Sequence, residues 1–256
     1  MTQDIYVELF KQTKPAAEHG DMKAQSLLGA IYSEGSGVEK NYVEAVKWFK
    51  LAAAKGDASA QNYLGYAYAV GQGVVQNFVE AFKYYKLAAE QGLANAQYCL
   101  AKMFGDGEGV LQDDTESFKW CKLAAEQGYP AAQVGIAISY GTGKGVEKNH
   151  IKEHMWLNLA AEQNYAAAHY NLGYLFATGQ GVKQDYVLAA KLYKLAAERG
   201  YANAQNNLGV LYYTGKGVKK DFVEAVKWYK LAIAQGANEA QINLDRMQED
   251  RLIVVH

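Results

Sequence analysis

Two histidines one helical turn apart are the first candidates for chemistry in this sequence. Residues His150 to His154 read H-x-x-E-H, the inverted motif of a group of zinc proteases. Imidazoles at this spacing on a helix can bind one metal ion. No third ligand is identifiable, however, and the same two positions hold mostly Tyr, Phe or Val in the other repeats. We therefore expect core or boundary histidines and predict neither a metal nor a cofactor.

Two glycine-rich stretches resemble loops that bind phosphate. They are residues 105–109 (Gly-Asp-Gly-Glu-Gly) and 141–145 (Gly-Thr-Gly-Lys-Gly). A phosphate-binding loop of this kind follows a strand and opens a helix, whereas each of these stretches lies between two predicted helices. We interpret both as turns. The sequence also lacks a Ser-x-x-Lys motif and a credible nucleophile–base pair, so we predict that the protein is not an enzyme.

The chain repeats itself with a period of 36 residues. The register is marked by Gln25, Gln61, Gln97, Gln133, His169, Gln205 and Gln241. A fixed period in this range is typical of stacked repeat arrays, in which each unit packs only against its neighbours. The period therefore predicts one continuous array of repeated hairpins.

Residues 57–92 show what one unit contains. Apolar residues at three- and four-residue spacing predict a first helix, which ends at the glycine turn 71–74. Asn77 is predicted to cap a second helix, with Glu80 completing a capping box, and Gly92 to end it. The unit is therefore predicted to be a hairpin of two helices.

The same signals recur in the other units. Strong N-cap residues occur at Asn41, Asn77, Asp113, Asn149, Asp185 and Asp221, and helix-ending residues at Gly56, Gly92, Gly128, Asn164, Gly200 and Gly236. Asparagine tolerates the left-handed conformation, so Asn164 supports this geometry. Glycines within the first helix occur at Gly29, Gly65, Gly173 and Gly209, where we expect close helix approach assisted by Ala-Ala pairs. Pro15 is expected to kink or split the opening helix.

The repeat resembles the Sel-1-like repeat, a relative of the tetratricopeptide repeat. Its pattern is nearly complete at Leu208-Gly209, Tyr212, Gly215, Gly217-Val218, Asp221-Phe222, Ala225 and Trp228-Tyr229. The resemblance implies a bacterial all-α protein, a right-handed α/α superhelix or solenoid of six repeats. These are repeats 1 to 6, at residues 21–56, 57–92, 93–128, 129–164, 165–200 and 201–236. Residues 1–20 are expected to be an N-terminal half-repeat cap, and 237–256 a C-terminal capping helix and tail, with Leu252–Val255 docked on the last unit.

One face of the first helices varies between repeats and is the predicted binding site. Two positions hold Ser26, Asn62, Tyr98, Val134, Tyr170 and Asn206, and Ala30, Tyr66, Lys102, Ile138, Tyr174 and Val210. Resemblance to tetratricopeptide arrays implies that first helices line a concave side. We therefore predict a partner-binding face made of Asn62, Tyr66, Tyr98, Lys102, Tyr170, Tyr174, Asn206 and Asn207. Tyrosines among amides suit a protein or peptide partner.

The resemblance implies an adaptor or scaffold, since Sel-1-like proteins mostly act in multiprotein assemblies. Some bacterial members neutralise a toxic effector, so an immunity protein is an alternative. Some cysteine-rich relatives bind or hydrolyse β-lactams, which leaves a weak hydrolase as a further alternative. Those relatives carry cysteine pairs near the helix ends, and residues 53–60 contain none.

Composition narrows the partners and the compartment. The net charge of −1 gives no electrostatic reason to expect nucleic acid, and no apolar run is long enough for membrane insertion. We expect a monomer. The sequence as given predicts a cytoplasmic protein, or a periplasmic or secreted one if a signal peptide was removed. Cys99 and Cys121 are expected to be reduced.

Two further features concern the second helices. Lysines and glutamates spaced three or four residues apart predict a solvated, ion-paired surface there. The fourth repeat departs from the others, with Gly135, His150 and Lys152-Glu153 at unusual positions. We expect it to be either a softer joint or a place altered for function.

Overall fold

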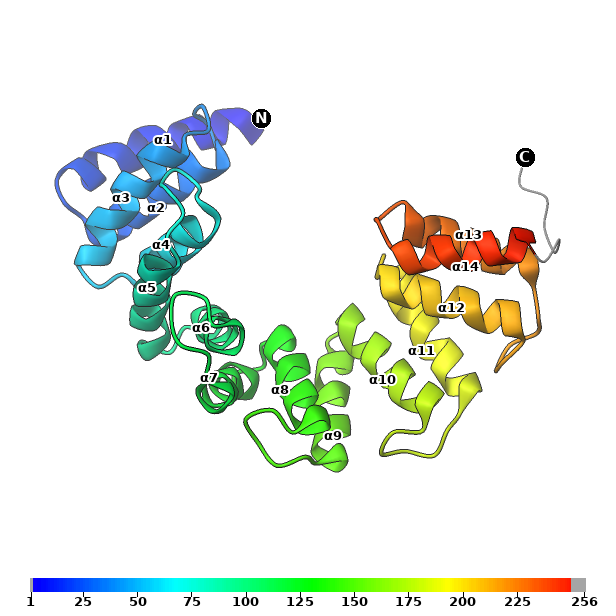
Figure 1. The fold of residues 1–256 in the computed structure, drawn as a ribbon. Helices are drawn as coiled ribbons and strands as arrows, with labels where there is room; N and C mark the ends of the chain where they lie inside the picture. The colour runs from blue at the N-terminus through cyan, green and yellow to red at the C-terminus, as the bar shows by residue number, and fades with distance from the viewer. Residues whose placement is uncertain (1, 250–256) are drawn as a thin grey trace. The chain divides into compact units, whose positions relative to one another are not determined.

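The computed structural model describes residues 2–249, which form helices joined by short loops and contain no strand (Figure 1). The helices are α1 (Thr2–Glu18), α2 (Met22–Glu34), α3 (Tyr42–Ala54), α4 (Ala58–Val70), α5 (Phe78–Glu90), α6 (Ala94–Asp106), α7 (Asp114–Glu126), α8 (Pro130–Thr142), α9 (His150–Glu162), α10 (Ala166–Thr178), α11 (Tyr186–Glu198), α12 (Ala202–Thr214), α13 (Phe222–Ile233) and α14 (Asn238–Glu249). Each repeat contributes one even-numbered and one odd-numbered helix, from α2–α3 to α12–α13. The predicted all-α architecture is confirmed.

The chain divides into two compact units. The first unit consists of the residues up to 132 together with 144–146, and the second of 133–143 and the residues from 147 onward. The division falls within α8, in the fourth repeat. A softer joint in that repeat stays a prediction.

Local capping explains where the second helices begin. The side chains of Asn41, Asn77, Asp113, Asn149, Asp185 and Asp221 all accept a hydrogen bond from a backbone N–H of the first turn, as predicted. The predicted capping box of Asn77 and Glu80 is wrong. The backbone N–H of Asn77 donates to the Tyr68 carbonyl at 2.9 Å, and the Glu80 carboxylate binds Lys83 at 2.6 Å instead. The preceding first helix therefore satisfies the donor that the glutamate was expected to bind.

Left-handed residues end the second helices, also as predicted. The predicted glycines have positive φ, and Asn164, with φ of 59°, is the single non-glycine residue of the described chain in this region. The expectation that Pro15 splits the opening helix is wrong, because α1 continues through it to Glu18. Only one helical turn follows Pro15, so little of the helix depends on the hydrogen bond that proline cannot donate.

The glycines inside the first helices make room for an aromatic ring. A Cβ atom on Gly65 would lie 2.6 Å from Cδ1 of the Tyr85 ring, and the same relation joins Gly29 to Phe49, Gly173 to Tyr193 and Gly209 to Tyr229. Repeats 3 and 4 instead carry alanine at the first position and a smaller partner at the second, Ala101 with Cys121 and Ala137 with Leu157. The close approach is confirmed, but it is a ring, rather than the alanine pairs, that fills the space beside each glycine.

A second set of glycines brings each loop against the preceding repeat. The second glycine of the loop after a first helix has positive φ, and an added Cβ would lie within 2.5 Å of the backbone of the preceding second helix. This holds for Gly37, Gly73, Gly109, Gly145 and Gly217. The loops are therefore packed turns, as predicted, rather than open phosphate-binding loops.

The buried glutamines among those that mark the register form a ladder between repeats. Gln61 Nε2 donates to the carbonyl of Ala53, in the preceding second helix, at 3.3 Å. Gln61 Oε1 accepts from Gln91 Nε2, at the end of its own repeat, at 2.7 Å. The donor contact recurs at Gln25, Gln97 and Gln205, and the Gln–Gln contact at Gln97, Gln133 and Gln205. Each such side chain adds a second donor to a helix-end carbonyl that also accepts the backbone N–H three residues later, as Ala53 accepts from Gly56 at 3.0 Å.

Repeat 5 replaces both members of this pair together. His169 stands in place of the first glutamine and Arg199 in place of the second. The His169 ring is buried, with Nδ1 at 3.2 Å from the Tyr165 carbonyl, and the Arg199 guanidinium donates to the carbonyl of Leu195 and to Asn164 Oδ1. Burial lowers the pKa of His169; the Tyr165 hydrogen bond opposes this change, and the Arg199 charge adds to it.

We predict that acid destabilises the chain through His169. Between its lowered pKa in the folded state and the ordinary value near 6.5, the unfolded chain binds more protons than the folded chain. The free energy of unfolding therefore falls as the pH drops through this window. His169→Gln/Arg199→Gln restores the pair of the other repeats and is expected to reduce the fall, measured by urea unfolding at about pH 5 and about pH 7.5. The exposed His19→Gln is the control; an equal effect of both variants would contradict the assignment.

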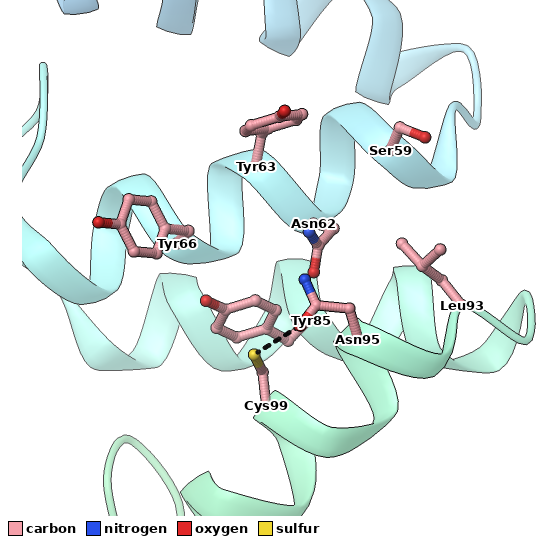
Figure 2. A pocket seen from close by; sticks show the side chains of 8 residues that line it. All are labelled: Ser59, Asn62, Tyr63, Tyr66, Tyr85, Leu93, Asn95 and Cys99. Atoms are coloured by element: carbon pink, nitrogen blue, oxygen red, sulfur yellow. Dashed lines mark hydrogen bonds between the residues drawn. The ribbon is translucent and has the colours of Figure 1, made fainter. Parts of the chain in front are cut away.

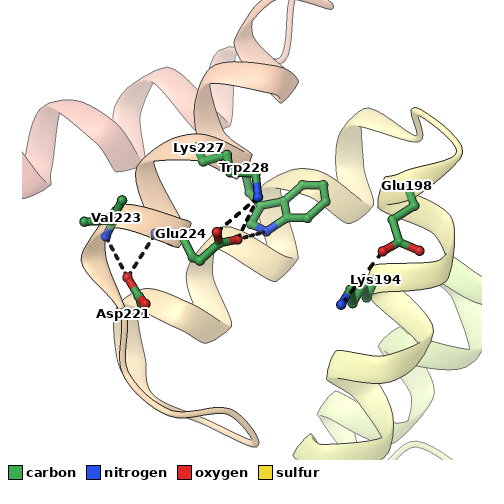
Figure 3. A network of polar contacts seen from close by, with 7 residues as sticks. All are labelled: Lys194, Glu198, Asp221, Val223, Glu224, Lys227 and Trp228. Carbon is green, nitrogen blue, oxygen red and sulfur yellow. Dashed lines mark hydrogen bonds and ion pairs between the residues drawn. The ribbon is translucent and has the colours of Figure 1, made fainter.

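The second helices carry the predicted ion pairs. Lys227 binds Glu224 at 3.0 Å, and Lys194 lies 3.8 Å from Glu198 (Figure 3). Glu224 also accepts a hydrogen bond from the Trp228 indole at 3.1 Å. Such exposed pairs contribute little to stability. They are the ion pairs that the spacing of lysines and glutamates indicated, and they share the second-helix surface with exposed leucines such as Leu87 and Leu195.

Helix α14 follows the last repeat and packs on it through Ala240, Leu244 and Met247. That residues 237–256 act as a cap stays a prediction. The predicted docking of Leu252–Val255 lies outside the described residues. Cys99 and Cys121 are free thiols.

Candidate partner-binding surfaces

In the first unit, the varied residues of α4 border a pocket. Tyr66 is 48% exposed, and the exposed Tyr63 ring stacks on Phe49 with centroids 4.7 Å apart. The pocket, of about 470 Å³, lies between α4, α5 and α6 (Figure 2). It is lined by Ser59, Asn62, Tyr63, Tyr66, Tyr85, Leu93, Asn95 and Cys99. The structure therefore brings the predicted residues Asn62 and Tyr66 together at one cavity.

This pocket is neutral. All eight lining residues are of uncharged types. Burial raises the pKa of the Cys99 thiol, although a hydrogen bond from Tyr85 and the Lys102 charge oppose this change. Burial likewise raises the pKa of the Tyr85 hydroxyl. The thiol is therefore protonated at neutral pH and a poor nucleophile.

Tyr98 and Lys102, the other predicted residues of the first unit, lie on α6. The half-buried Tyr98 ring packs at 5.4 Å from the Tyr129 ring, whose hydroxyl donates to Asn95 Oδ1 at 3.1 Å. Lys102 is exposed. Neither residue lines the pocket, to which α6 contributes Asn95 and Cys99 instead.

In the second unit, the tyrosines of α10 form a comparable surface. The half-buried Tyr170 ring lies 5.1 Å from Tyr201 and 5.9 Å from Tyr193, and burial raises the pKa of its hydroxyl. Tyr174 is 41% exposed. Together with Asn207, Tyr174 lines a pocket of about 220 Å³ beside α12.

Asn206 differs from the prediction because it is buried. We expected it on the exposed face, but it is only 5% exposed. Its Oδ1 accepts a hydrogen bond from Asn243 Nδ2 at 2.9 Å, and its Nδ2 donates to Asn207 Oδ1 at 3.4 Å. Because α14 supplies Asn243, the last repeat buries a position that is only half-buried in repeat 2. Asn206 therefore links α12 to α14, and the prediction that it is exposed is wrong.

Sequence reasoning missed Tyr63 and Cys99. Both belong to a position that also varies, which holds Leu27, Tyr63, Cys99, Gly135, Asn171 and Asn207. Of this set, the predicted partner-binding face includes only Asn207. The variation at this position could have revealed them, because Tyr63 lies next to Asn62 on the same helix.

The sequence marks Glu153 as unusual but does not indicate that it lines a cavity. It is 9% exposed and stands where other repeats place Ala or Ser. Its carboxylate lies where a Cβ of Gly141 would be, 2.2 Å from Oε1, so this glycine makes room for it. Glu153 lines a cavity of about 460 Å³ in the second unit. Lys148, Asn171 and Tyr174 are among the other lining residues.

The two histidines of the H-x-x-E-H stretch have separate partners. His150 Nδ1 lies 2.6 Å from Glu153 Oε2. His154 Nδ1 lies 2.9 Å from Asn158 Nδ2, and its ring contacts the Phe176 ring edge-on at 5.9 Å. Over the part of the chain that the structure describes, no three His, Cys, Asp or Glu side chains are placed to hold a metal ion. Both histidines are half-buried boundary residues, as expected.

None of the described helices combines the length and the apolar composition needed to cross a bilayer.

Hairpins of two helices, stacked at a fixed period, define a helical-repeat solenoid. The family model "Sel1 repeat" matches residues 23–57, 58–93, 94–129, 130–165, 166–201 and 202–236. The chain belongs to the Sel1 repeat family. No curated protein matches the sequence.

Solved structures agree with this assignment. The chain is 35% identical to c5321, a protective antigen of uropathogenic Escherichia coli strains with an SLR fold, at a TM-score of 0.79. That match covers 94% of this chain and 52% of c5321, so the chain spans about half the length of the E. coli protein. A Sel1 repeat protein from Oxalobacter formigenes is 29% identical, with 91% and 97% coverage and a TM-score of 0.81.

A more distant likeness concerns the fold alone. The immunity protein Pa5087 of Pseudomonas aeruginosa is 20% identical over 82% of this chain and 83% of its own, with a TM-score of 0.56.

Proposed function

We propose that this chain is a non-enzymatic scaffold that binds a segment of a partner protein on its first-helix surface, including the exposed tyrosines Tyr66 and Tyr174. Sel1 repeat proteins are generally protein-interaction scaffolds. One observation carries the assignment to this surface. Tyrosines remain exposed beside amide groups and preformed pockets in both units, whereas the second helices expose ion pairs together with aliphatic side chains such as Leu87 and Leu195.

The chemistry of the surface supports this function. Tyrosine offers a large contact area with few rotatable bonds and a hydroxyl that can bind a partner's backbone. Neighbouring amides, such as Asn207 beside Tyr174, supply both donors and acceptors. The protonated Cys99 thiol favours binding over hydrolysis at the neutral pocket.

The test compares two matched double variants as baits in affinity capture. Tyr66→Ala/Tyr174→Ala removes two exposed rings from the first-helix surface. Leu87→Ala/Leu195→Ala removes two side chains of similar exposure, 46% and 40%, from the second helices. We expect the tyrosine variant to bind the captured partner at least tenfold more weakly, because aromatic anchors dominate protein interfaces. The leucine variant is expected to bind as the native chain does.

Both variants must first show unchanged helicity and melting by circular dichroism. Equal retention of the partner by both variants would contradict the first-helix surface. Loss in the leucine variant alone would assign binding to the second helices.

A further inference from the structure

A buried carboxylate in the second unit keeps one oxygen without a donor. Glu153 lines the cavity of about 460 Å³, and its side chain is 12% exposed. Its Oε2 lies 2.6 Å from His150 Nδ1, whereas none of the residues in 2–249 donates a hydrogen bond to Oε1. Within the described residues, the enclosed side-chain atoms without a partner are Gln25 Oε1 and Asn62 Oδ1, so Glu153 Oε1 is accessible. It lies against Gly141, which lines the same cavity.

Repeat 3 shows how a polar residue at this position is satisfied internally. Ser117 is the counterpart of Glu153, and Gly105 is the counterpart of Gly141. Ser117 Oγ donates to the Ala101 carbonyl at 2.8 Å. An ionised carboxylate has no proton to donate and requires donors for its own oxygens, and a buried charge without a partner is costly. The acidic side chain of repeat 4 therefore provides an acceptor that the fold does not use.

The surroundings of Glu153 favour a cation. Gly141 and Thr142 belong to the last turn of α8, and the C-terminal end of a helix carries partial negative charge. Asn171, on α10, donates through Nδ2 to a backbone carbonyl at 2.7 Å, which leaves its Oδ1 as a further acceptor. The lining therefore offers a carboxylate oxygen, an amide oxygen and a helix end to a positively charged donor.

The walls and the single unpaired oxygen favour lysine over arginine. Ile138 and Tyr174, which are both exposed, provide apolar surface for an aliphatic stem. A guanidinium binds a carboxylate best through two parallel hydrogen bonds, but His150 already binds one of the two oxygens of Glu153. An ammonium group needs only one oxygen and can direct its other donors to neighbouring acceptors.

We infer that this cavity is a subsite for a lysine side chain of the partner segment, whose ammonium group donates to Glu153 Oε1 and whose stem contacts Ile138 and Tyr174. Tyr174 belongs to the proposed first-helix surface, so the inference rests on the proposed function and specifies what the partner presents there. Lys148 also lines the cavity, but it is exposed, and the ion pair of Glu153 is with His150 instead. Lys148 is therefore a competing cation within the chain.

The test uses a defined probe, N-acetyl-lysine N′-methylamide, titrated into the whole protein at about pH 7.5, where lysine and glutamate are ordinarily charged. Binding is followed by NMR of the backbone amides around the cavity. We expect a Kd of about 1 mM for a probe of this size. The analogue acetylated on the ε-nitrogen keeps the stem but loses the charge, and is expected to bind about tenfold more weakly, because a charge-assisted hydrogen bond is lost. The arginine analogue is also expected to bind more weakly than the lysine probe.

Two variants of the chain supply the second arm. Glu153→Gln keeps the size of the side chain and removes its charge, so it is expected to bind the lysine probe about tenfold more weakly. Lys148→Gln introduces the residue that repeats 2, 3 and 5 carry at this position and removes the competing cation, so it is expected to bind the probe more tightly. The comparison of probes uses the native chain, so the test stands even if a variant folds poorly.

Four results would overturn the inference. One is the absence of a response in the native chain at the solubility limit of the lysine probe. The others are equal binding of the acetylated analogue, tighter binding of the arginine analogue, and binding that both folded variants leave unchanged.

The outcome separates this inference from the proposed function. If the tyrosine variant loses the partner while the native chain does not respond to the lysine probe, the subsite is wrong and the scaffold function stands. If the probes and variants behave as expected while the tyrosine variant keeps the partner, the cavity is retained as a lysine site and the proposed first-helix surface is contradicted.

Discussion

Replacing Gly73 with alanine is expected to lower the free energy of unfolding by about 3–5 kcal/mol, the largest single loss that we predict. Gly73 has a φ of 73°, which disfavours any residue with a Cβ. The added Cβ would also lie 2.3 Å from the carbonyl oxygen of Tyr42 in the preceding repeat. Because that oxygen belongs to a helix backbone, it cannot rotate away as a side chain would.

Gly92→Ala is the matched control for this loss. Gly92 lies in the same unit with a φ of 88°, but an added Cβ would meet no atom of the described residues within 4 Å. It carries the conformational penalty alone, about 1–2 kcal/mol. Urea unfolding followed by circular dichroism measures both variants. Equal losses would show that the backbone contact at Gly73 does not limit stability.

The second large effect concerns Gly209→Ala, whose effect on the free energy of unfolding is expected to change sign with the residue at position 229. In the native chain, Gly209→Ala is expected to destabilise by about 2–3 kcal/mol, since overpacking a buried core forces neighbouring side chains to move. The added Cβ would lie 2.6 Å from the ring of Tyr229, a fully buried side chain. In a Tyr229→Leu background the same change is expected to stabilise by up to about 1 kcal/mol, the helix preference of alanine over glycine.

Repeat 4 already contains the second combination. Ala137 and Leu157 occupy these two positions, and both are buried in one core cluster. A double-mutant cycle of Gly209→Ala and Tyr229→Leu, measured by urea unfolding, gives the coupling energy directly. If Gly209→Ala costs the same free energy in both backgrounds, the ring does not explain why repeat 6 has a glycine.

Features that depend on a few neighbouring residues could be predicted from the sequence. The N-cap at Asn77 and the left-handed Asn164 follow from side-chain chemistry within one turn of helix. The capping box failed because Glu80 had a second partner, Lys83, at equal distance along the helix. Pattern alone does not decide which of two local partners a carboxylate binds.

The site was less predictable because its cavities need three helices. Tyr66 and Tyr174 were predicted from variation along a single helix, and both are exposed. The exposure predicted for Asn206 was wrong, because its side chain is paired with Asn243, which belongs to a helix outside the regular repeats. The Asn62 pocket likewise depends on residue 99, one repeat away. Comparing the residue pairs 62/99 and 206/243, rather than single positions, would have indicated both the burial of Asn206 and the role of residue 99.

The glutamine ladder bears on how such a chain can change its length. In repeats 2, 3 and 6, one glutamine donates to the carbonyl of the preceding repeat and accepts from a glutamine at the end of its own. Each such repeat contains one glutamine amide that donates to the preceding repeat and one helix-end carbonyl that accepts from the following repeat. Duplication or deletion of a whole repeat therefore adds or removes one of each. The number of buried groups without a partner stays the same. Duplications in multiples of 36 residues therefore preserve this network, whereas a partial repeat leaves a buried glutamine amide without its acceptor in the preceding repeat.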